Sequence, residues 1–514
     1  MFESVAANMT AWLVVWPVLI PILAAALAVA AWGHGRLQAL IGIVGIAAQL
    51  LSAVLLLSHV WNNGPVVMSM GGWSAPFGIA LAGDVFGAGL TVAASLVALA
   101  IIVYSLGDIS ADHLRAGFFP LVLALIAGVA GAFLTSDIFN LYVWFEVTLI
   151  SSFGLIVLGG RREQIDGAVK YAFLNLLATT FLLIAIGLLY GMTGTLNMAD
   201  LSAKVAALPQ DATLETVALL LLVSLGMKAA LFPLYFWLPA AYHTPLPAVS
   251  AIFAALLTKV GVYSLIRVFL TVFPDSADLA REAMIWAALA TMMLGALGAL
   301  AESDLRRLVS FTVISGVGVM VAGLAIGTET ALLGSIFYII HSIIISATLF
   351  MAAGLVTRIG GGTKIENLSG LYKGAPFLSV VFLISGLSLA GVPPFAGFWP
   401  KIYLVQAGLE SGEYRLVAGI LIAGFLTLLA IGRTFALVFW RSAPEGEAPP
   451  AFPPQKGDFI VKGTLGALTA LTIALGLYSA PAVNMSKRAA ADLLSPQPYI
   501  DVVLDKVRDR DSRP

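Results

Sequence analysis

Long apolar segments, each about as long as a membrane-spanning helix, follow one another along almost the whole chain. A span needs about 20 mostly apolar residues, and the polar stretches between these segments are too short to hold a soluble domain of ordinary size. Hydrophobic residues make up 60% of the 514 residues and charged residues only 11%, whereas soluble domains average about 25% charged residues. The sequence therefore predicts an all-α, polytopic membrane protein.

The composition also argues against several kinds of site. The chain has no cysteine, which excludes thiolate-ligated iron–sulfur clusters, disulfides and cysteine-type zinc sites. Its five histidines are far apart in the sequence, and no P-loop is present. We therefore expect no cofactor, and no nucleic-acid partner because there is no basic patch. The first apolar stretch lacks a basic flank and a clear cleavage site, so we expect a retained span rather than a signal peptide.

Segment length and hydropathy predict about fourteen spans. Prolines interrupt two of them. The predicted segments lie near residues 11–32, 37–58, 82–106, 116–135, 137–158, 167–190, 214–240, 247–271, 283–301, 306–326, 331–356, 375–409, 416–440 and 459–480.

Basic residues are distributed unevenly between the two sides of these spans. Loops rich in lysine and arginine stay in the cytoplasm, so the rich side is expected to be cytoplasmic and the N-terminus to lie outside. The tail after residue 480 would then also lie outside, although it is basic in part. The poor side has only Lys204, Arg281 and Arg415. The rich side has Arg36, Arg115, Arg161, Arg162, Lys170, Arg306, Arg307, Arg358, Lys364, Lys373, Arg441, Lys456 and Lys462.

The two interrupted spans are the strongest topological signal. Pro233 lies within the segment 219–240, and Pro393 and Pro394 lie within the segment 384–401. Proline removes a backbone hydrogen bond, and the polar groups that it frees are tolerated only against protein or water. Broken helices at corresponding places in two halves are typical of inverted-repeat transporters, whose path runs near the middle of the membrane.

Ionisable side chains lie deep in the apolar segments. Lys228, Lys259, Lys401 and Glu146 all have such positions, and a lysine in the centre of a span costs roughly 2.5–3.5 kcal/mol to insert. For Glu146 the alternative to a transport role is a fixed ion pair between helices, and for Lys259 it is snorkelling to the interface. We favour transport for both, because charges inside membranes are functional by default.

Three further polar positions have simpler readings. His341, alone on an apolar segment, is either a satisfied core residue or a proton relay between lysines, and both readings stay open. Asp137 at a helix start is expected to cap that helix. Arg267, near the end of its span, is expected to snorkel to the interface.

A buried lysine holds its proton more firmly when a carboxylate approaches. A lysine–carboxylate pair whose separation changes would therefore bind and release a proton, and several such groups in line would conduct protons.

Five blocks of this sequence resemble the antiporter-like membrane subunits shared by Mrp-type Na⁺/H⁺ antiporters and respiratory complex I. The likeness extends over roughly residues 80–440, and the first and third blocks are similar to the D subunits of Mrp (Mnh or Pha) antiporters. The blocks are 136–146 (SDIFNLYVWFE), 226–241 (GMKAALFPLYFWLPAA), 257–263 (LTKVGVY), 304–307 (DLRR) and 391–401 (GVPPFAGFWPK).

The resemblance implies a fourteen-helix subunit with inverted five-helix repeats and a hydrated central axis of charged residues. Residues 1–115 would hold three N-terminal helices, 116–271 the first repeat, 283–440 the second repeat, and 441–514 the last helix and the tail. The five residues that would translocate protons are Glu146 of the fifth helix, Lys228 of the broken seventh, Lys259 of the eighth, His341 of the eleventh and Lys401 of the broken twelfth.

One position departs from the family pattern. Many D subunits have a lysine five residues after the histidine, and this chain has Ser346 there. Either water and His341 carry the proton across this position, or the half-channels connect differently.

We therefore predict a subunit of a multi-subunit antiporter in the bacterial cell membrane, which exchanges Na⁺ for protons and is not itself an enzyme. Its partners would be a large A-type subunit and small hydrophobic subunits. The alternative is a proton-pumping subunit of a redox complex related to complex I or membrane hydrogenase, and a third reading is a structural scaffold. The sequence does not locate a metal site, since Na⁺ prefers several oxygen ligands and no deep carboxylate cluster beyond Glu146 is present.

Overall fold

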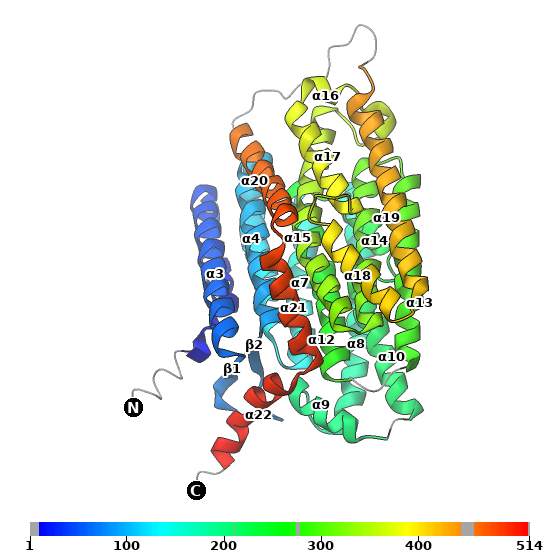
Figure 1. The fold of residues 1–514 in the computed structure, drawn as a ribbon. Coiled ribbons are helices and arrows are strands. Elements are labelled where there is room, and N and C mark those ends of the chain that lie inside the picture. The colour runs from blue at the N-terminus through cyan, green and yellow to red at the C-terminus, as the bar shows by residue number, and fades with distance from the viewer. Residues whose placement is uncertain (1–9, 74, 210, 274–277, 444–456, 512–514) are drawn as a thin grey trace.

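The computed structural model describes residues 10–73, 75–209, 211–273, 278–443 and 457–511. Within these ranges the chain forms an elongated bundle of long helices with one short β-hairpin (Figure 1). Twelve helices of the described part are long and apolar enough to cross a membrane, and two shorter apolar helices accompany them. The prediction of a helical, multi-pass membrane protein is confirmed, while the total of fourteen spans stays a prediction.

The N-terminal part contains a hairpin that the sequence analysis missed. Its strands pair antiparallel, with Val66 opposite Gly83, and at four residues each they are too short to give a clear alternating pattern. The elements are α2 (Trp16–Ala30), α3 (Gly35–Asn63), β1 (Val66–Ser69), β2 (Ala80–Gly83), α4 (Val85–Asp108) and α5 (Ala111–His113).

The central part consists of two sets of helices in the same order: three long helices, one broken helix and a further long helix. The first set is α6 (Phe119–Leu134), α7 (Ile138–Ile156), α8 (Arg162–Thr193), the broken pair α10 (Ala212–Ala229) and α11 (Trp237–Ala241), and α12 (Pro247–Thr271), with α9 (Met198–Ala207) as a connection. The second set is α13 (Asp278–Ala301), α14 (Leu305–Ile326), α15 (Glu329–Ile359), the broken pair α17 (Pro376–Ala390) and α18 (Phe398–Glu410), and α19 (Tyr414–Phe435), with α16 (Leu371–Gly374) as a connection.

The two sets also share a detail at the start of their second helix. Asp137 caps α7 by accepting from the backbone amide of Asn140 at 2.7 Å, which confirms the predicted cap. In the second set, Asp304 caps α14 in the same way. Each of these aspartates forms an isolated antiparallel bridge with a residue that follows the third helix, Asn197 for Asp137 and Lys364 for Asp304.

The C-terminal part returns along the bundle. It forms α20 (Asp458–Leu477), α21 (Ala480–Leu494) and α22 (Gln497–Asp511), of which α21 packs against α15 and α22 against α9 and β1 (Figure 1). A small core joins Tyr499 and Val503 of α22 to Val67 and Ala80 of the hairpin. The tail is therefore folded onto the end of the bundle that bears the hairpin.

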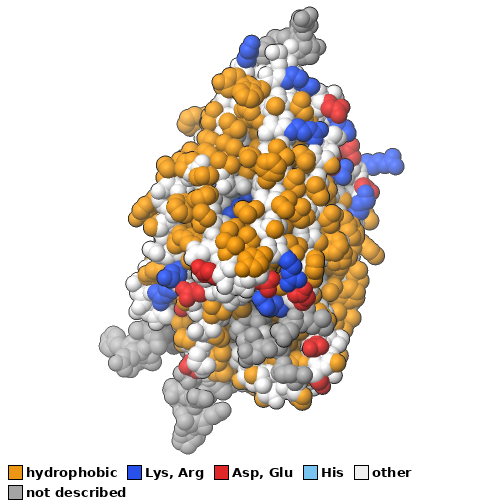
Figure 2. Space-filling model, turned by 45° about the vertical axis from the view of Figure 1, so that its right-hand side comes forward, with side chains coloured by type: hydrophobic (Ala, Val, Ile, Leu, Met, Phe, Trp, Pro, Cys, Tyr) orange, Lys and Arg blue, Asp and Glu red, His pale blue; other side chains and the backbone are white. Residues whose placement is uncertain are grey.

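Charges gather toward the two ends of the molecule, and hydrophobic side chains cover the middle (Figure 2). Two arginines of the predicted cytoplasmic set meet at one place, where Arg161 donates to the carbonyl of Thr244 and Arg306 to the carbonyl of Pro245. At another place Arg415, which belongs to the side predicted to have few basic residues, pairs with Glu282 at 2.7 Å. The assignment of these ends to cytoplasm and exterior stays a prediction.

Candidate functional site

Four of the five predicted transport residues lie in one of two kinds of place. Two are next to a helix break, and two are within the most buried spans. Lys228 is the last residue but one of α10, just before the first break, and Lys401 is in α18 just after the second. Lys259 and His341 lie within α12 and α15, whose most apolar windows are completely buried inside the protein. The side chains of Lys228, Lys259 and His341 are 5% exposed or less. Deep burial of so many ionisable groups requires protein or water partners for each.

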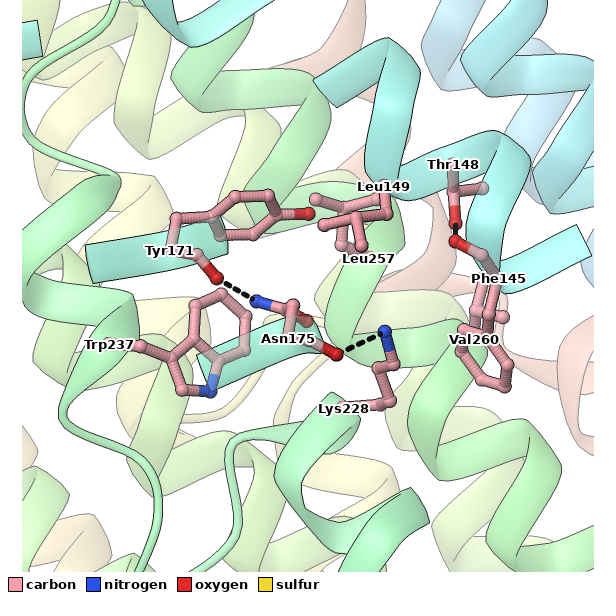
Figure 3. A pocket seen from close by; sticks show the side chains of 9 residues that line it. All are labelled: Phe145, Thr148, Leu149, Tyr171, Asn175, Lys228, Trp237, Leu257 and Val260. Atoms are coloured by element: carbon pink, nitrogen blue, oxygen red, sulfur yellow. Dashed lines mark hydrogen bonds between the residues drawn. The ribbon is translucent and has the colours of Figure 1, made fainter. Parts of the chain in front are cut away.

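Lys228 lies in a small polar cavity inside the first set of helices (Figure 3). Its Nζ donates to the backbone carbonyl of Asn175 at 3.3 Å and lies 5.4 Å from the centre of the Phe145 ring. The cavity measures about 20 Å³, which is room for about one water molecule. Its walls are Phe145, Thr148, Leu149, Tyr171, Asn175, Lys228, Trp237, Leu257 and Val260.

Glu146 is on α7 next to this cavity, since its neighbour Phe145 forms part of the wall. Its carboxylate is within electrostatic range of Lys228. Among the described residues, however, the ion pairs within 4.0 Å do not include Glu146 with Lys228. A fixed contact pair, the alternative reading of Glu146, is therefore not formed. The two side chains are therefore farther apart than the 4.0 Å of an ion pair.

Lys259 is buried at 0% exposure in the centre of the protein. Its Nζ donates to the carbonyl of Ala254 at 2.5 Å and to Ser346 Oγ at 3.4 Å. Snorkelling is excluded, because protein surrounds the whole most apolar window of α12. The contact with Ser346 joins the first set of helices to α15 of the second set.

The Lys228 cavity and Lys259 are close neighbours. Leu257 and Val260, which flank Lys259 in the sequence, line that cavity. Helix α12 approaches the end of α10 at Gly261, where an added Cβ would lie 2.8 Å from the backbone carbon of Lys228. The absence of a side chain at Gly261 therefore brings the two lysine-bearing elements together.

His341 faces the second helix break. Its Nε2 and Ser388 Oγ are 3.0 Å apart, and Ser388 Oγ also accepts from the backbone amide of Gly397 at 3.4 Å. A Cβ at Gly397 would lie 2.9 Å from the imidazole. His341 is within electrostatic range of both Lys259 and Lys401. Its Nδ1 is buried without a hydrogen-bond partner among the described residues, and both readings of His341, core residue and proton relay, stay predictions.

Lys401 uses the backbone that the second break sets free. Its Nζ donates to the carbonyls of Leu389 and Ala390, at 3.0 and 2.7 Å. These are the last two residues of α17, and the final carbonyls of a helix have no partner within it. The break thus supplies two acceptors, and the negative end of the helix dipole favours the ammonium there.

Arg267 corrects one expectation from the sequence. The predicted snorkelling arginine is 3% exposed, and its Nη2 lies 2.5 Å from Asp84 Oδ2. Its Nε donates to the hydroxyl of Tyr263 at 3.3 Å, and its guanidinium lies 5.0 Å from the centre of the Tyr499 ring. The partners are the N-cap residue of α4, a tyrosine of α12 itself and a tyrosine of α22, so this arginine joins helices inside the protein instead of reaching the interface.

Two contacts of the ionisable groups are not evident from the sequence. Lys228 contacts the backbone carbonyl of Asn175, and His341 contacts the hydroxyl of Ser388. Both partners are uncharged residues in apolar segments, so only the fold reveals these contacts. The described residues include no group of three or more histidine, aspartate or glutamate side chains placed to hold a metal ion. Oxygen ligands near this site are mainly hydroxyls and backbone carbonyls.

Comparison with known proteins places these features in a family context. The model of the membrane domain described as NADH:quinone oxidoreductase/Mrp antiporter matches residues 135–427. The D subunit of a Na⁺/H⁺ antiporter from Alkalihalophilus pseudofirmus is 40% identical over 471 residues, which cover 92% of this chain and 95% of that protein.

Two solved structures share the fold over nearly the whole chain. A chain of the Mrp complex from Dietzia sp. DQ12-45-1b has a TM-score of 0.88 and 31% identity, covering 96% of this chain and 99% of that one. A chain of the membrane-bound sulfane sulfur reductase, an archaeal respiratory membrane complex, has a TM-score of 0.87 and 28% identity, covering 96% of this chain and 100% of that one.

Proposed function

Because the chain belongs to the family of NADH:quinone oxidoreductase and Mrp antiporter membrane subunits, we propose that it is a D-type subunit of a multi-subunit antiporter that exchanges Na⁺ for protons. The observation that supports this most is the burial of Lys228, Lys259 and His341, together with the half-buried Lys401 at the second helix break. Protons would pass along Glu146, Lys228, Lys259, His341 and Lys401. The chain is then a transporter subunit and not an enzyme.

The assembly and its location follow from the same proposal. The partners are the other subunits of an Mrp-type complex, a large A-type subunit and small hydrophobic subunits, within a bacterial cell membrane. The N-terminus lies outside the cell. Residues 116–271 and 283–440 act as two inverted repeats, which the matching bridges of Asp137 and Asp304 support, flanked by residues 1–115 and 441–514.

A second function has a specific observation in its favour. The similarity to a chain of the sulfane sulfur reductase complex fits a proton-pumping subunit of a redox complex. The degree of likeness to an antiporter D subunit, 40% identity over most of both chains, favours the antiporter.

Imposed pH gradients in inverted vesicles distinguish the two functions. Vesicles that contain the complete complex are given a proton gradient without a redox donor, and Na⁺ is then added. The antiporter predicts that Na⁺ collapses the gradient, because each entering cation is exchanged for protons. The redox pump predicts no response to Na⁺ and a gradient that builds up when NADH or another donor is supplied.

A further inference from the structure

Two serine hydroxyls of α15 follow one another from the ammonium of Lys259. Lys259 Nζ donates to Ser346 Oγ at 3.4 Å, and Ser346 Oγ lies 3.5 Å from Ser342 Oγ. The serines are four residues apart on α15, so they lie on one face of that helix, and both are 3% exposed. Ser342 directly follows His341 in the sequence. The hydroxyls therefore start at the ammonium of Lys259 and end one residue from the imidazole.

The imidazole of His341 is suited to receive a proton on one nitrogen and release it from the other. Nε2 is already hydrogen-bonded to Ser388 Oγ, which leads toward the second break. Nδ1 is buried and has no hydrogen-bond partner among the described residues, although buried polar atoms are normally paired. The unpaired Nδ1 is thus the free end of the ring.

We propose that Ser346 and Ser342 conduct protons between Lys259 and His341, a role that rests on the proposed function above. The ammonium of Lys259 gives a proton to Ser346 Oγ while the hydroxyl proton of Ser346 passes to Ser342 Oγ. The proton released by Ser342 passes to a bridging water, whose own proton binds His341 Nδ1. Lys259 ends neutral and His341 ends as a cation, and the two serines and the water end unchanged.

The geometry requires a water and a small motion in this transfer. Ser342 Oγ and His341 Nδ1 form no hydrogen bond, because that nitrogen has no partner among the described residues, so the transfer needs water between them. Distances of 3.4 and 3.5 Å are at the long end of hydrogen bonding. Rotation of a serine side chain therefore accompanies each transfer. This link occupies the position at which the resemblance leads one to expect a lysine.

The test removes the first hydroxyl and then restores it. In vesicles with the complete complex, Ser346→Ala is expected to slow Na⁺-driven proton transport by about tenfold or more and to raise its solvent deuterium isotope effect. Ser346→Thr, which returns a hydroxyl, is expected to recover most of the rate. The matched control is Ser335→Ala on the same helix, a fully buried serine whose Oγ donates instead to the carbonyl of Met320.

Comparison with Lys259→Met separates this proposal from the proposed function. If Ser346→Ala transports at the wild-type rate while Lys259→Met abolishes transport, the serine link is overturned and the proposed antiporter function stands. Unchanged rates in both variants would overturn the proposed function as well. An equal loss in Ser335→Ala would mark the effect as structural and overturn the link. If Ser346→Ala does not assemble, Ser342→Ala decides the question by the same criteria.

Discussion

Replacement of Lys228 by alanine is expected to lower Na⁺-dependent proton transport by about 100-fold or more, while the complex still assembles. Lys228 is 5% exposed and faces a cavity with room for about one water. Its ammonium can bind and release a proton, and it lies in the last turn of α10, just before the break. Alanine leaves that cavity without an amine to bind and release a proton, so the path between Glu146 and Lys259 is interrupted. The rate is measured as Na⁺-induced collapse of an imposed pH gradient in vesicles.

Lys170→Ala is the matched control for this variant. Lys170 is on α8 and its side chain is 53% exposed, where it pairs with Asp166. Exposed pairs of this kind contribute roughly 0–1 kcal/mol, so transport and assembly are expected to stay at wild-type levels. A Lys228→Ala complex that assembles and transports at the wild-type rate would contradict the role given to Lys228.

Replacement of Arg267 by methionine is expected to destabilise the protein by about 3–5 kcal/mol. The Arg267 and Asp84 side chains are 4% and 6% exposed, so the variant leaves a carboxylate buried without its cation. The variant also loses the contact between the guanidinium and the Tyr499 ring, through which α22 packs on the Arg267–Asp84 pair. The measurement is the thermal unfolding midpoint of the purified complex, which is expected to fall.

The double variant Asp84→Asn with Arg267→Met tests the physical reason for this loss. Removing both charges relieves the buried unpaired carboxylate, so the double variant is expected to be more stable than Arg267→Met alone. Arg433→Met is the control, since Arg433 is exposed and donates to the carbonyl of Leu300. A double variant no more stable than the single one would show that lost packing, and not the unpaired charge, causes the effect.

The sequence predicted those parts of the fold that depend on local composition. The spans follow from apolar length, and the two breaks follow from Pro233 and from Pro393 with Pro394, because proline cannot continue a helix. The capping role of Asp137 is equally local. The hairpin of β1 and β2 was missed, because its four-residue strands lie in an apolar context that gives no alternating pattern.

Contacts between distant segments set the limits of prediction. The partner of Arg267 is Asp84, 183 residues away, and the hydroxyl that accepts from Lys259 belongs to Ser346, 87 residues away. No pattern around Arg267 distinguishes an arginine near a span end that snorkels from one that pairs inside the bundle. The buried ionisable residues were evident from their cost in an apolar segment, but the order in which neutral residues connect them required the fold.

Parallel measurement of ²²Na⁺ uptake and proton flux in vesicles containing the complete complex with Lys259→Met tests the central claim most directly. Lys259 lies where the first set of helices contacts α15, so exchange along the axis has to pass it. The account predicts that both fluxes stop together in an assembled Lys259→Met complex. Na⁺-driven proton flux at the wild-type rate in that complex would contradict it.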